Sequence, residues 1–208
     1  MPESMQQLAW QTSLFAGGEP GFDASFTDVE RHELDHGAWV DEVRGWVRGA
    51  DELFASMLEL TPWQLRYVWM YERRVSEPRL THHWRLREED PPLPILGAMA
   101  EALSDRYGVA FTQVGANLYR NGMDSVAWHG DRVARDLEEA TVALVSLGTP
   151  RPFKLRPKSG GKSIGFMPDR GDLLVMGGSC QRTWDHAVPK VKSVGPRMSV
   201  QFRHAYDR

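Results

Sequence analysis

The sequence predicts an α+β fold in which N-terminal helices support a sandwich or jelly roll of short strands. Two patterns predict it. Apolar residues in the first half recur at three- and four-residue steps, which is typical of amphipathic helices. Short apolar runs separated by Gly, Pro and Asp turns fill the second half. The length of 208 residues, of which 41% are hydrophobic, suits one domain with a sizeable core.

The first half is expected to hold an arm and two helices. Residues 1–25 show no lasting period and contain several glycines, so we expect a flexible N-terminal arm. Apolar spacing over residues 39–58 predicts an amphipathic helix, broken near Gly49. A second helix is expected over residues 94–107, and Gly108 is placed to end it.

The second half is expected to consist of strands. VALVSLG, at 142–148, is an apolar run suited to a strand covered on both faces, and FKLR, SIGF and DLLVM are shorter candidates. In RMSVQFR, at 197–203, apolar and polar residues alternate, so one face suits the core and the other carries Arg197 and Arg203. We therefore expect one domain over residues 26–208, with helical support up to residue 108 and a strand-rich core after it.

Composition narrows the possible partners. No apolar run approaches the roughly 18 residues that a membrane span needs, so no membrane is expected. The single cysteine, Cys180, cannot form an intramolecular disulfide, which favours a cytoplasmic protein. A net charge of −3 requires any nucleic-acid binding to rest on a local basic surface. Residues 151–162 contain basic residues and no acid, and are the candidate for that surface.

A metal site is indicated by the stretch NLYRNGMDSVAWHGD, at 117–131. His129 and Asp131 are two residues apart in an extended segment, so their side chains point to the same side. A second histidine would complete the facial triad of two histidines and one carboxylate that is typical of non-haem Fe(II) oxygenases. Of the seven histidines, His186 is the best candidate because it follows the strand-like DLLVM and a turn-rich segment.

The motifs together resemble the AlkB family of Fe(II)- and 2-oxoglutarate-dependent dioxygenases, nearest to its alkylation-repair members. Asn-x-Tyr, His-x-Asp, a distal His and Arg-x5-Arg occur in that order, and the resemblance covers about residues 77–206. It implies a double-stranded β-helix, which is a jelly roll. It also implies that His129, Asp131 and His186 bind Fe(II), with 2-oxoglutarate and O₂ as co-substrates.

The resemblance assigns co-substrate residues by position. Arg197, with Tyr119, would bind the distal carboxylate of 2-oxoglutarate, a contact for which a guanidinium is well shaped. Asn117 and Arg203 would lie near the end that chelates the metal. The family's last strand has Asn and Thr where this chain has Ser199 and Gln201, and both replacements keep a polar side chain on the same face.

The resemblance also implies a substrate class. The expected activity is oxidative demethylation of alkylated bases in DNA or RNA, as in DNA repair or RNA demethylation, with release of formaldehyde, succinate and CO₂. The base must be flipped out or single-stranded to reach the iron. The segment SEPRLTHHWRL, at 76–86, resembles the substrate-recognition segment, in which Trp84 or His83 would stack on the base opposite His129, with Arg79 nearby.

One departure leaves alternatives open. Repair members carry an acid two residues after the metal aspartate, and this chain has Val133 there. Hydroxylation of a protein or small molecule by the same chemistry is one alternative. A jelly-roll binding module without a metal is another, which the three intact ligand positions argue against. We expect a monomer.

Overall fold

The computed structural model describes residues 18–70, 73–131 and 137–204, which form three antiparallel sheets. The largest sheet contains, in spatial order, β2 (Val29–Glu33), β3 (Ala38–Val43), β12 (Leu173–Gly178), β9 (Val142–Gly148), β14 (Arg197–Arg203), β7 (Gln113–Tyr119), β6 (Arg73–Arg85) and β5 (Gln64–Met70). The second contains β11 (Ile164–Phe166), β10 (Phe153–Pro157), β13 (Trp184–Val188) and β8 (Val126–His129). The third pairs β1 (Gly21–Phe22) with β4 (Val47–Arg48).

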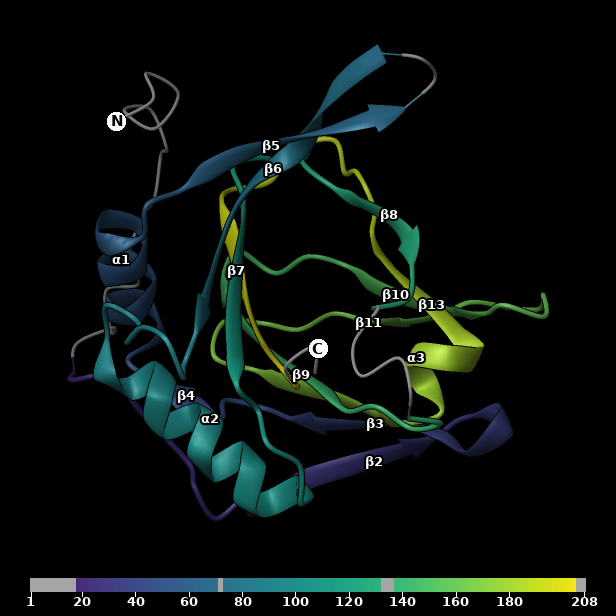
Figure 1. Cartoon of the computed structure of the whole chain (residues 1–208), viewed down its shortest axis with the longest axis horizontal. Coiled ribbons are helices and arrows are strands. Elements are labelled where there is room, and N and C mark those ends of the chain that lie inside the picture. Colours follow the sequence, from purple (N-terminus) through teal and green to yellow (C-terminus); the bar gives the residue numbers. More distant parts are fainter. Residues whose placement is uncertain (1–17, 71–72, 132–136, 205–208) are drawn as a thin grey trace.

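The eight-stranded and four-stranded sheets face each other as a jelly roll (Figure 1). Between them lies a buried apolar cluster that includes Val40, Leu144 and Leu174 from the larger sheet and Phe153 and Leu155 from the smaller one. This cluster fills one part of the space between the sheets, and polar side chains line the rest. The expected α+β jelly roll with supporting helices is confirmed.

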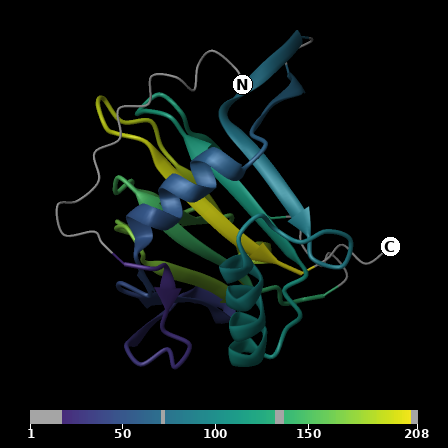
Figure 2. The ribbon, with the colours of Figure 1, turned by 90° about the vertical axis from the view of Figure 1, so that its left-hand side faces the viewer.

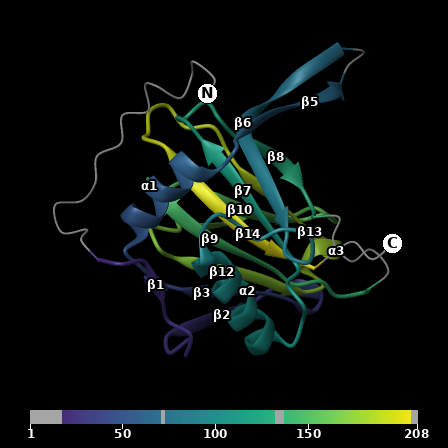
Figure 3. The same cartoon turned by 60° about the vertical axis from the view of Figure 1, so that its left-hand side comes forward.

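Two helices cover the outer face of the larger sheet (Figures 2 and 3). They are α1 (Ala50–Leu60) and α2 (Pro94–Tyr107); the shorter α3 (Cys180–Thr183) and a 3₁₀ turn (Asp35–Gly37) lie elsewhere. The helix expected over residues 94–107 is confirmed, with Pro94 in its first turn and Gly108 at a left-handed φ of 66° after its last residue. No helix in the described part of the chain is long and apolar enough to cross a membrane.

The helix expected over residues 39–58 is wrong in its first half. Residues up to Val43 form β3, which pairs with β2 and β12, and the helix begins only after Gly49. In β3, Val40 faces the inter-sheet cluster and Val43 the helix-side core, so both faces of the strand are covered. A strand buried on both faces has apolar residues at many spacings, and some of these imitate a helical period.

The predicted arm and internal division also need correction. From Gly21 onward the chain is attached, because β1 pairs with β4 and the Asp23 carbonyl accepts a hydrogen bond from Trp46 Nε1 at 2.8 Å. Residues 1–17 lie outside the described residues. The part before residue 108 contributes β2, β3, β5 and β6 to the eight-stranded sheet, so it supplies half of that sheet as well as helical support.

Candidate metal centre

Two histidines and one aspartate meet where β8 and β13 pair. His129 lies directly opposite His186 in the antiparallel register, and their ring centroids are 4.3 Å apart. Asp131 follows His129 by two residues, as the extended spacing requires. One ligand atom from each of the three lies within 4.8 Å of the others. These two imidazoles and one carboxylate are the donor set that suits Fe(II) with coordination positions left open.

The charge states of this group fit a metal. Burial alone would raise the pKa of Asp131, but the Arg203 guanidinium together with the two neighbouring imidazoles outweighs burial, and the pKa falls to about 2. Arg203 Nε donates to Asp131 Oδ2 at 3.0 Å. Burial lowers the pKa of His186 to about 3. The carboxyl group is therefore ionised and this imidazole neutral near pH 7, which are the forms that bind metals.

Neighbouring groups hold the ligands in place. His129 Nδ1 lies 2.9 Å from the Ala127 carbonyl oxygen, and a proton on Nδ1 leaves Nε2 free for a metal. The side-chain oxygen of Gln181 accepts a hydrogen bond from the Asp131 backbone N–H at 3.0 Å. Lys158 Nζ in turn donates to the Gln181 carbonyl oxygen at 3.1 Å. Sequence reasoning missed Gln181 and Lys158, because no local pattern links residues so far apart in the chain.

Replacing Gln181 with leucine tests whether its hydrogen bond to the Asp131 backbone positions this ligand. We expect Gln181→Leu to weaken Fe(II) affinity about tenfold, because the Asp131 backbone N–H loses its acceptor while the buried volume is kept. Anaerobic metal titration measures the affinity, and Gln64→Leu, on exposed β5, is the matched control. Equal affinity in the two variants would show that Gln181 does not position Asp131.

Arg197 is a buried guanidinium that has no counter-ion among the described residues. It is 1% exposed, and neither Nη1 nor Nη2 has a hydrogen-bond partner among the described residues. Its Nε donates to Ser146 Oγ at 3.2 Å, and its Cζ lies 5.3 Å from the centre of the Tyr119 ring. A buried charge is costly unless it is paired, so this site fits the carboxylate of a small acid such as 2-oxoglutarate.

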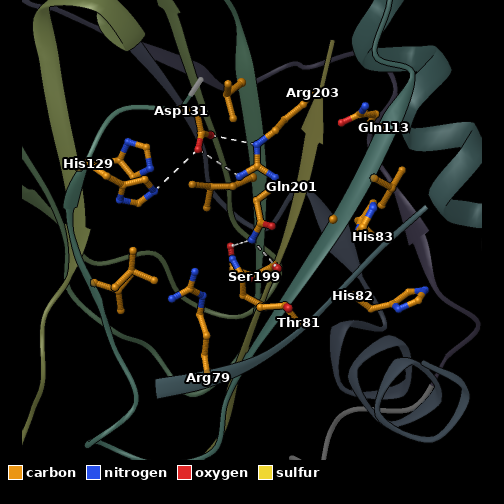
Figure 4. A pocket seen from close by; sticks show the side chains of 18 of the residues that line it. Arg79, Thr81, His82, His83, Gln113, His129, Asp131, Ser199, Gln201 and Arg203 are labelled. Carbon is orange, nitrogen blue, oxygen red and sulfur yellow. Dashed lines mark hydrogen bonds and ion pairs between the residues drawn. The ribbon is translucent and has the colours of Figure 1, made fainter. Parts of the chain in front are cut away.

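A cavity of about 430 Å³ is lined by Arg197 and by the metal-ligand group. Figure 4 shows His129, Asp131 and Arg203 among its lining side chains. Its floor is made by neighbouring strands in register: Ser199 of β14 lies opposite Asn117 of β7, which lies opposite Thr81 of β6. Arg197 pairs with Tyr119 at one end of this floor, and Arg203 with Gln113 at the other. The structure thus brings together all the residues expected to hold the metal and 2-oxoglutarate.

Several residues of the cavity, among them Thr81 and Gly115, were not predicted from the sequence. Gln201 Nε2 donates to Ser199 Oγ at 2.6 Å, and Thr81 lines the floor beside Asn117. Gly115 leaves room for two polar side chains, because a Cβ there would lie 3.1 Å from Arg203 Nη1 and 3.2 Å from Gln201 Oε1 and would press on both. The position of Gln201 is the one expected from the sequence, because alternation along β14 places it on the face of Arg197 and Arg203.

The expected substrate residues divide between two faces of β6. Arg79 and His83 line the cavity, as predicted. The expectation for Trp84 is wrong, because it is 3% exposed and packs in the helix-side core on the opposite face. Neighbouring residues in a strand point to opposite faces, and Trp84, next to His83, packs in the core and does not line the cavity.

The basic segment 151–162 is partly structural. Arg151 is fully buried, and its terminal nitrogens donate to the carbonyl oxygens of Asn121, Asp124 and Pro189. Lys154, Arg156 and Lys162 remain exposed. Only part of this segment is therefore available to phosphates.

A second group of possible ligands lies on β2 and β3. Glu30, His32 and Glu42 place ligand atoms within 4.8 Å of one another. Glu42 already forms an ion pair with Arg44 at 2.7 Å, and Glu30 is largely exposed. The group at His129 is the stronger candidate, because it adjoins the cavity and Arg197.

Comparison with known proteins agrees with this geometry. The family model described as the 2OG-Fe(II) oxygenase superfamily matches residues 64–203. The human protein named alpha-ketoglutarate-dependent dioxygenase alkB homolog 3 is 30% identical over 180 residues, which are 77% of this chain and 63% of that protein. The Arabidopsis thaliana DNA oxidative demethylase ALKBH2 is 33% identical over 141 residues, 56% of this chain and 44% of that protein.

A solved structure shares the fold. The protein titled "The structure of OsALKBH1" superposes with a TM-score of 0.60 at 13% identity, covering 85% of this chain and 100% of that one. This chain spans about 63% of the length of the human relative. From its family-model match, the chain belongs to the 2OG-Fe(II) oxygenase superfamily, for which Fe(II), 2-oxoglutarate and O₂ are the cofactor and co-substrates, and it is similar to the alkB homologs within that superfamily.

Proposed function

We propose that this protein is an Fe(II)- and 2-oxoglutarate-dependent dioxygenase that demethylates alkylated bases in DNA or RNA. The observation that carries the proposal is the buried Arg197, whose two terminal nitrogens have no partner among the described residues, in the same cavity as the His129, Asp131 and His186 group. The proposal is further supported by the names of two relatives, a dioxygenase and a DNA oxidative demethylase.

Each polar residue of the cavity has a role in this proposal. His129, Asp131 and His186 hold Fe(II), and Arg197 with Tyr119 binds the distal carboxylate of 2-oxoglutarate. Arg203 keeps Asp131 ionised and oriented through their hydrogen bonds. Asn117 lies on the floor between the two ends, beside Ser199.

The protein contributes to the reaction by positioning the metal, the co-substrate and the methyl group, and by excluding water from them. Bound Fe(II), with 2-oxoglutarate and O₂, supplies the oxidation of an N-methyl group to N-hydroxymethyl, with succinate and CO₂ as co-products. The C–N bond of the hydroxymethyl group then breaks and formaldehyde leaves. The hydroxyl proton passes to the base nitrogen, which is thereby repaired. The methyl group must reach the His129 side of the cavity, where 41% of the imidazole side chain is exposed.

A projecting hairpin supports a nucleic-acid substrate. β5 and β6 extend away from the body of the protein (Figures 1 and 3). Trp69 is 76% exposed there and Tyr67 50%, with Arg74 Cζ 4.2 Å from the Tyr67 ring. Arg66 of the same hairpin lines the cavity. Exposed aromatic rings interleaved with arginines suit stacked bases and phosphates.

We expect Trp69→Ala to weaken binding of a single-stranded oligonucleotide about tenfold, because one base loses its stacking partner. Fluorescence anisotropy with a labelled oligonucleotide measures the affinity. Leu60→Ala, on α1, removes an apolar side chain that is 50% exposed and serves as the control. If both variants bind like the unchanged protein, the hairpin does not contact the nucleic acid.

Formaldehyde release from a panel of methylated DNA and RNA oligonucleotides tests the function itself. The purified protein is supplied with Fe(II), 2-oxoglutarate and O₂, and His129→Ala is the control. The proposal predicts formaldehyde from at least one oligonucleotide, with a rate that falls as salt rises, because phosphate contacts release counterions. Succinate formation without formaldehyde on any oligonucleotide would direct the search to proteins or small molecules.

We further propose that the protein acts as a cytoplasmic monomer in which Cys180 stays a reduced, buried thiol. The thiol is 2% exposed, and burial raises its pKa to about 12. We therefore expect Cys180 to resist iodoacetamide in the folded protein at neutral pH and to react after denaturation. Mass spectrometry of both samples checks this, and rapid labelling of the folded protein would contradict it.

A further inference from the structure

Gly130 lies between the ligand positions His129 and Asp131, and Lys158 occupies the space that a side chain there would fill. A Cβ at Gly130 would lie 2.9 Å from Lys158 Nζ and 3.0 Å from the Gln181 carbonyl oxygen. Both distances are shorter than a van der Waals contact, so only glycine fits while Lys158 stays in place. Lys158 therefore lies directly against the segment that carries two of the three proposed ligands.

Lys158 also binds the one-turn helix α3. It directly follows β10, and its backbone N–H donates to the Thr183 carbonyl oxygen at 2.8 Å. Its Nζ donates to the carbonyl oxygens of Gln181 and Arg182, at 3.1 and 2.9 Å. The last carbonyls of a helix have no donor within the helix, and a lysine ammonium suits them. β13, which carries His186, begins directly after α3 (Figure 1).

Gln181 connects α3 to the carboxylate ligand. Its side chain is buried, and its Oε1 accepts the hydrogen bond from the Asp131 backbone N–H at 3.0 Å. Lys158 thus acts on both chain segments that supply the ligands. It reaches residues 129–131 beside Gly130 and through Gln181, and it reaches the start of β13 through α3.

These contacts give Lys158 a different role from its neighbours in the basic segment 151–162. Two of the three N–H groups of its ammonium are used by carbonyl oxygens of α3. Lys154 and Lys162 are exposed and suit phosphates better. A phosphate bound by Lys158 would compete with the contacts that fix α3.

We propose that Lys158 is a positioning residue of the metal site and not a phosphate contact. It fixes residues 129–131 and the start of β13 relative to each other, so that the three ligands converge before the metal binds. This rests on the proposed function, because it takes His129, Asp131 and His186 as the ligands of Fe(II). It also accounts for the glycine at position 130, whose missing side chain leaves room for the ammonium.

Lys158→Met tests this role, because methionine keeps an aliphatic side chain and lacks the ammonium. We expect Fe(II) affinity, measured by anaerobic titration, to fall about fivefold, less than in Gln181→Leu because Lys158 acts through that residue. In the metal-free protein, NMR should show faster solvent exchange of the Asp131 amide. The amide of Val145, buried in β9, should exchange as slowly as before. Lys192→Met, an exposed lysine before β14, is the control.

Oligonucleotide binding separates positioning from a phosphate contact. Fluorescence anisotropy of the metal-free protein, repeated at several salt concentrations, measures the affinity and its salt dependence. We expect Lys158→Met to bind within about twofold of the unchanged protein, with the same slope of log affinity against log salt. Loss of a phosphate contact would reduce that slope by about one.

Gly130→Ala tests the direct contact with Lys158. The added methyl group displaces Lys158 Nζ from its two carbonyls, so we expect Fe(II) affinity to fall about fivefold. In Lys158→Met the nitrogen at 2.9 Å is gone. Adding Gly130→Ala to that variant should therefore lower the affinity by no more than about twofold further. Effects that multiply would show that the two residues act independently, and would overturn the direct contact.

The remaining outcomes separate this inference from the function beneath it. Fe(II) affinity and Asp131 amide exchange that are the same in Lys158→Met and in Lys192→Met would overturn the positioning role. Weaker oligonucleotide binding with unchanged Fe(II) affinity would make Lys158 a phosphate contact instead. If the unchanged protein binds no Fe(II), the proposed function fails, while the Asp131 amide, measured without metal, still decides whether Lys158 fixes this segment.

Discussion

Asp131→Asn is expected to lower turnover by more than about a hundredfold, the largest effect of any single substitution in this account. Asparagine has almost the same shape but no charge, so the metal loses its anionic ligand. Arg203 also loses the carboxylate to which two of its nitrogens donate. Formaldehyde and succinate release measure turnover, and anaerobic titration measures the accompanying loss of Fe(II) affinity.

The matched control for this substitution is Asp185→Asn. Asp185 precedes His186 on β13, but it pairs with Arg156 at 3.6 Å and does not line the cavity. We expect it to retain activity and metal binding. If Asp131→Asn bound Fe(II) as tightly as this control, Asp131 would not be a ligand and the metal site would have to be placed elsewhere.

Arg197→Met is expected to weaken 2-oxoglutarate binding by at least about thirtyfold, because a carboxylate would lose its charged partner in a buried site. Equilibrium binding of 2-oxoglutarate without O₂ measures this. The exposed Arg87, outside the cavity lining, gives the control Arg87→Met. An affinity within about threefold of the control would exclude Arg197 as the main carboxylate partner.

The same variant distinguishes a binding role from a structural one. Without 2-oxoglutarate, Arg197 is a buried charge whose terminal nitrogens lack partners among the described residues. Replacing it with methionine should raise the thermal stability of the ligand-free protein, since the uncompensated charge is removed. A residue that serves only the fold would give the opposite sign, namely a lower melting temperature.

The two-residue alternation of side chains along strands was enough to predict most of the site from the sequence. The alternation in RMSVQFR correctly separated the core residues Met198, Val200 and Phe202 from a polar face. The two-residue spacing of His129 and Asp131 placed both side chains beside His186, which the register of β8 and β13 brings opposite. These predictions succeeded because they depend on strand geometry alone.

Other features depend on contacts that the sequence does not display. Trp84 and His83 differ by one position, and only the pairing of β6 with β7 decides which of them faces the cavity. Gln181 reaches Asp131 through the fold, across a large separation in the chain. Residues 39–43 imitate a helix because β3 is covered on both faces. Val133 lies outside the described residues, so its consequence stays a prediction.

The most direct test of the account is a crystal structure of the protein with Mn(II) in place of Fe(II) and with 2-oxoglutarate. Anomalous scattering would locate the metal independently of any model. We predict one peak between His129, Asp131 and His186, and a carboxylate against Arg197. A peak at Glu30, His32 and Glu42 instead, or 2-oxoglutarate absent from the cavity, would contradict the account.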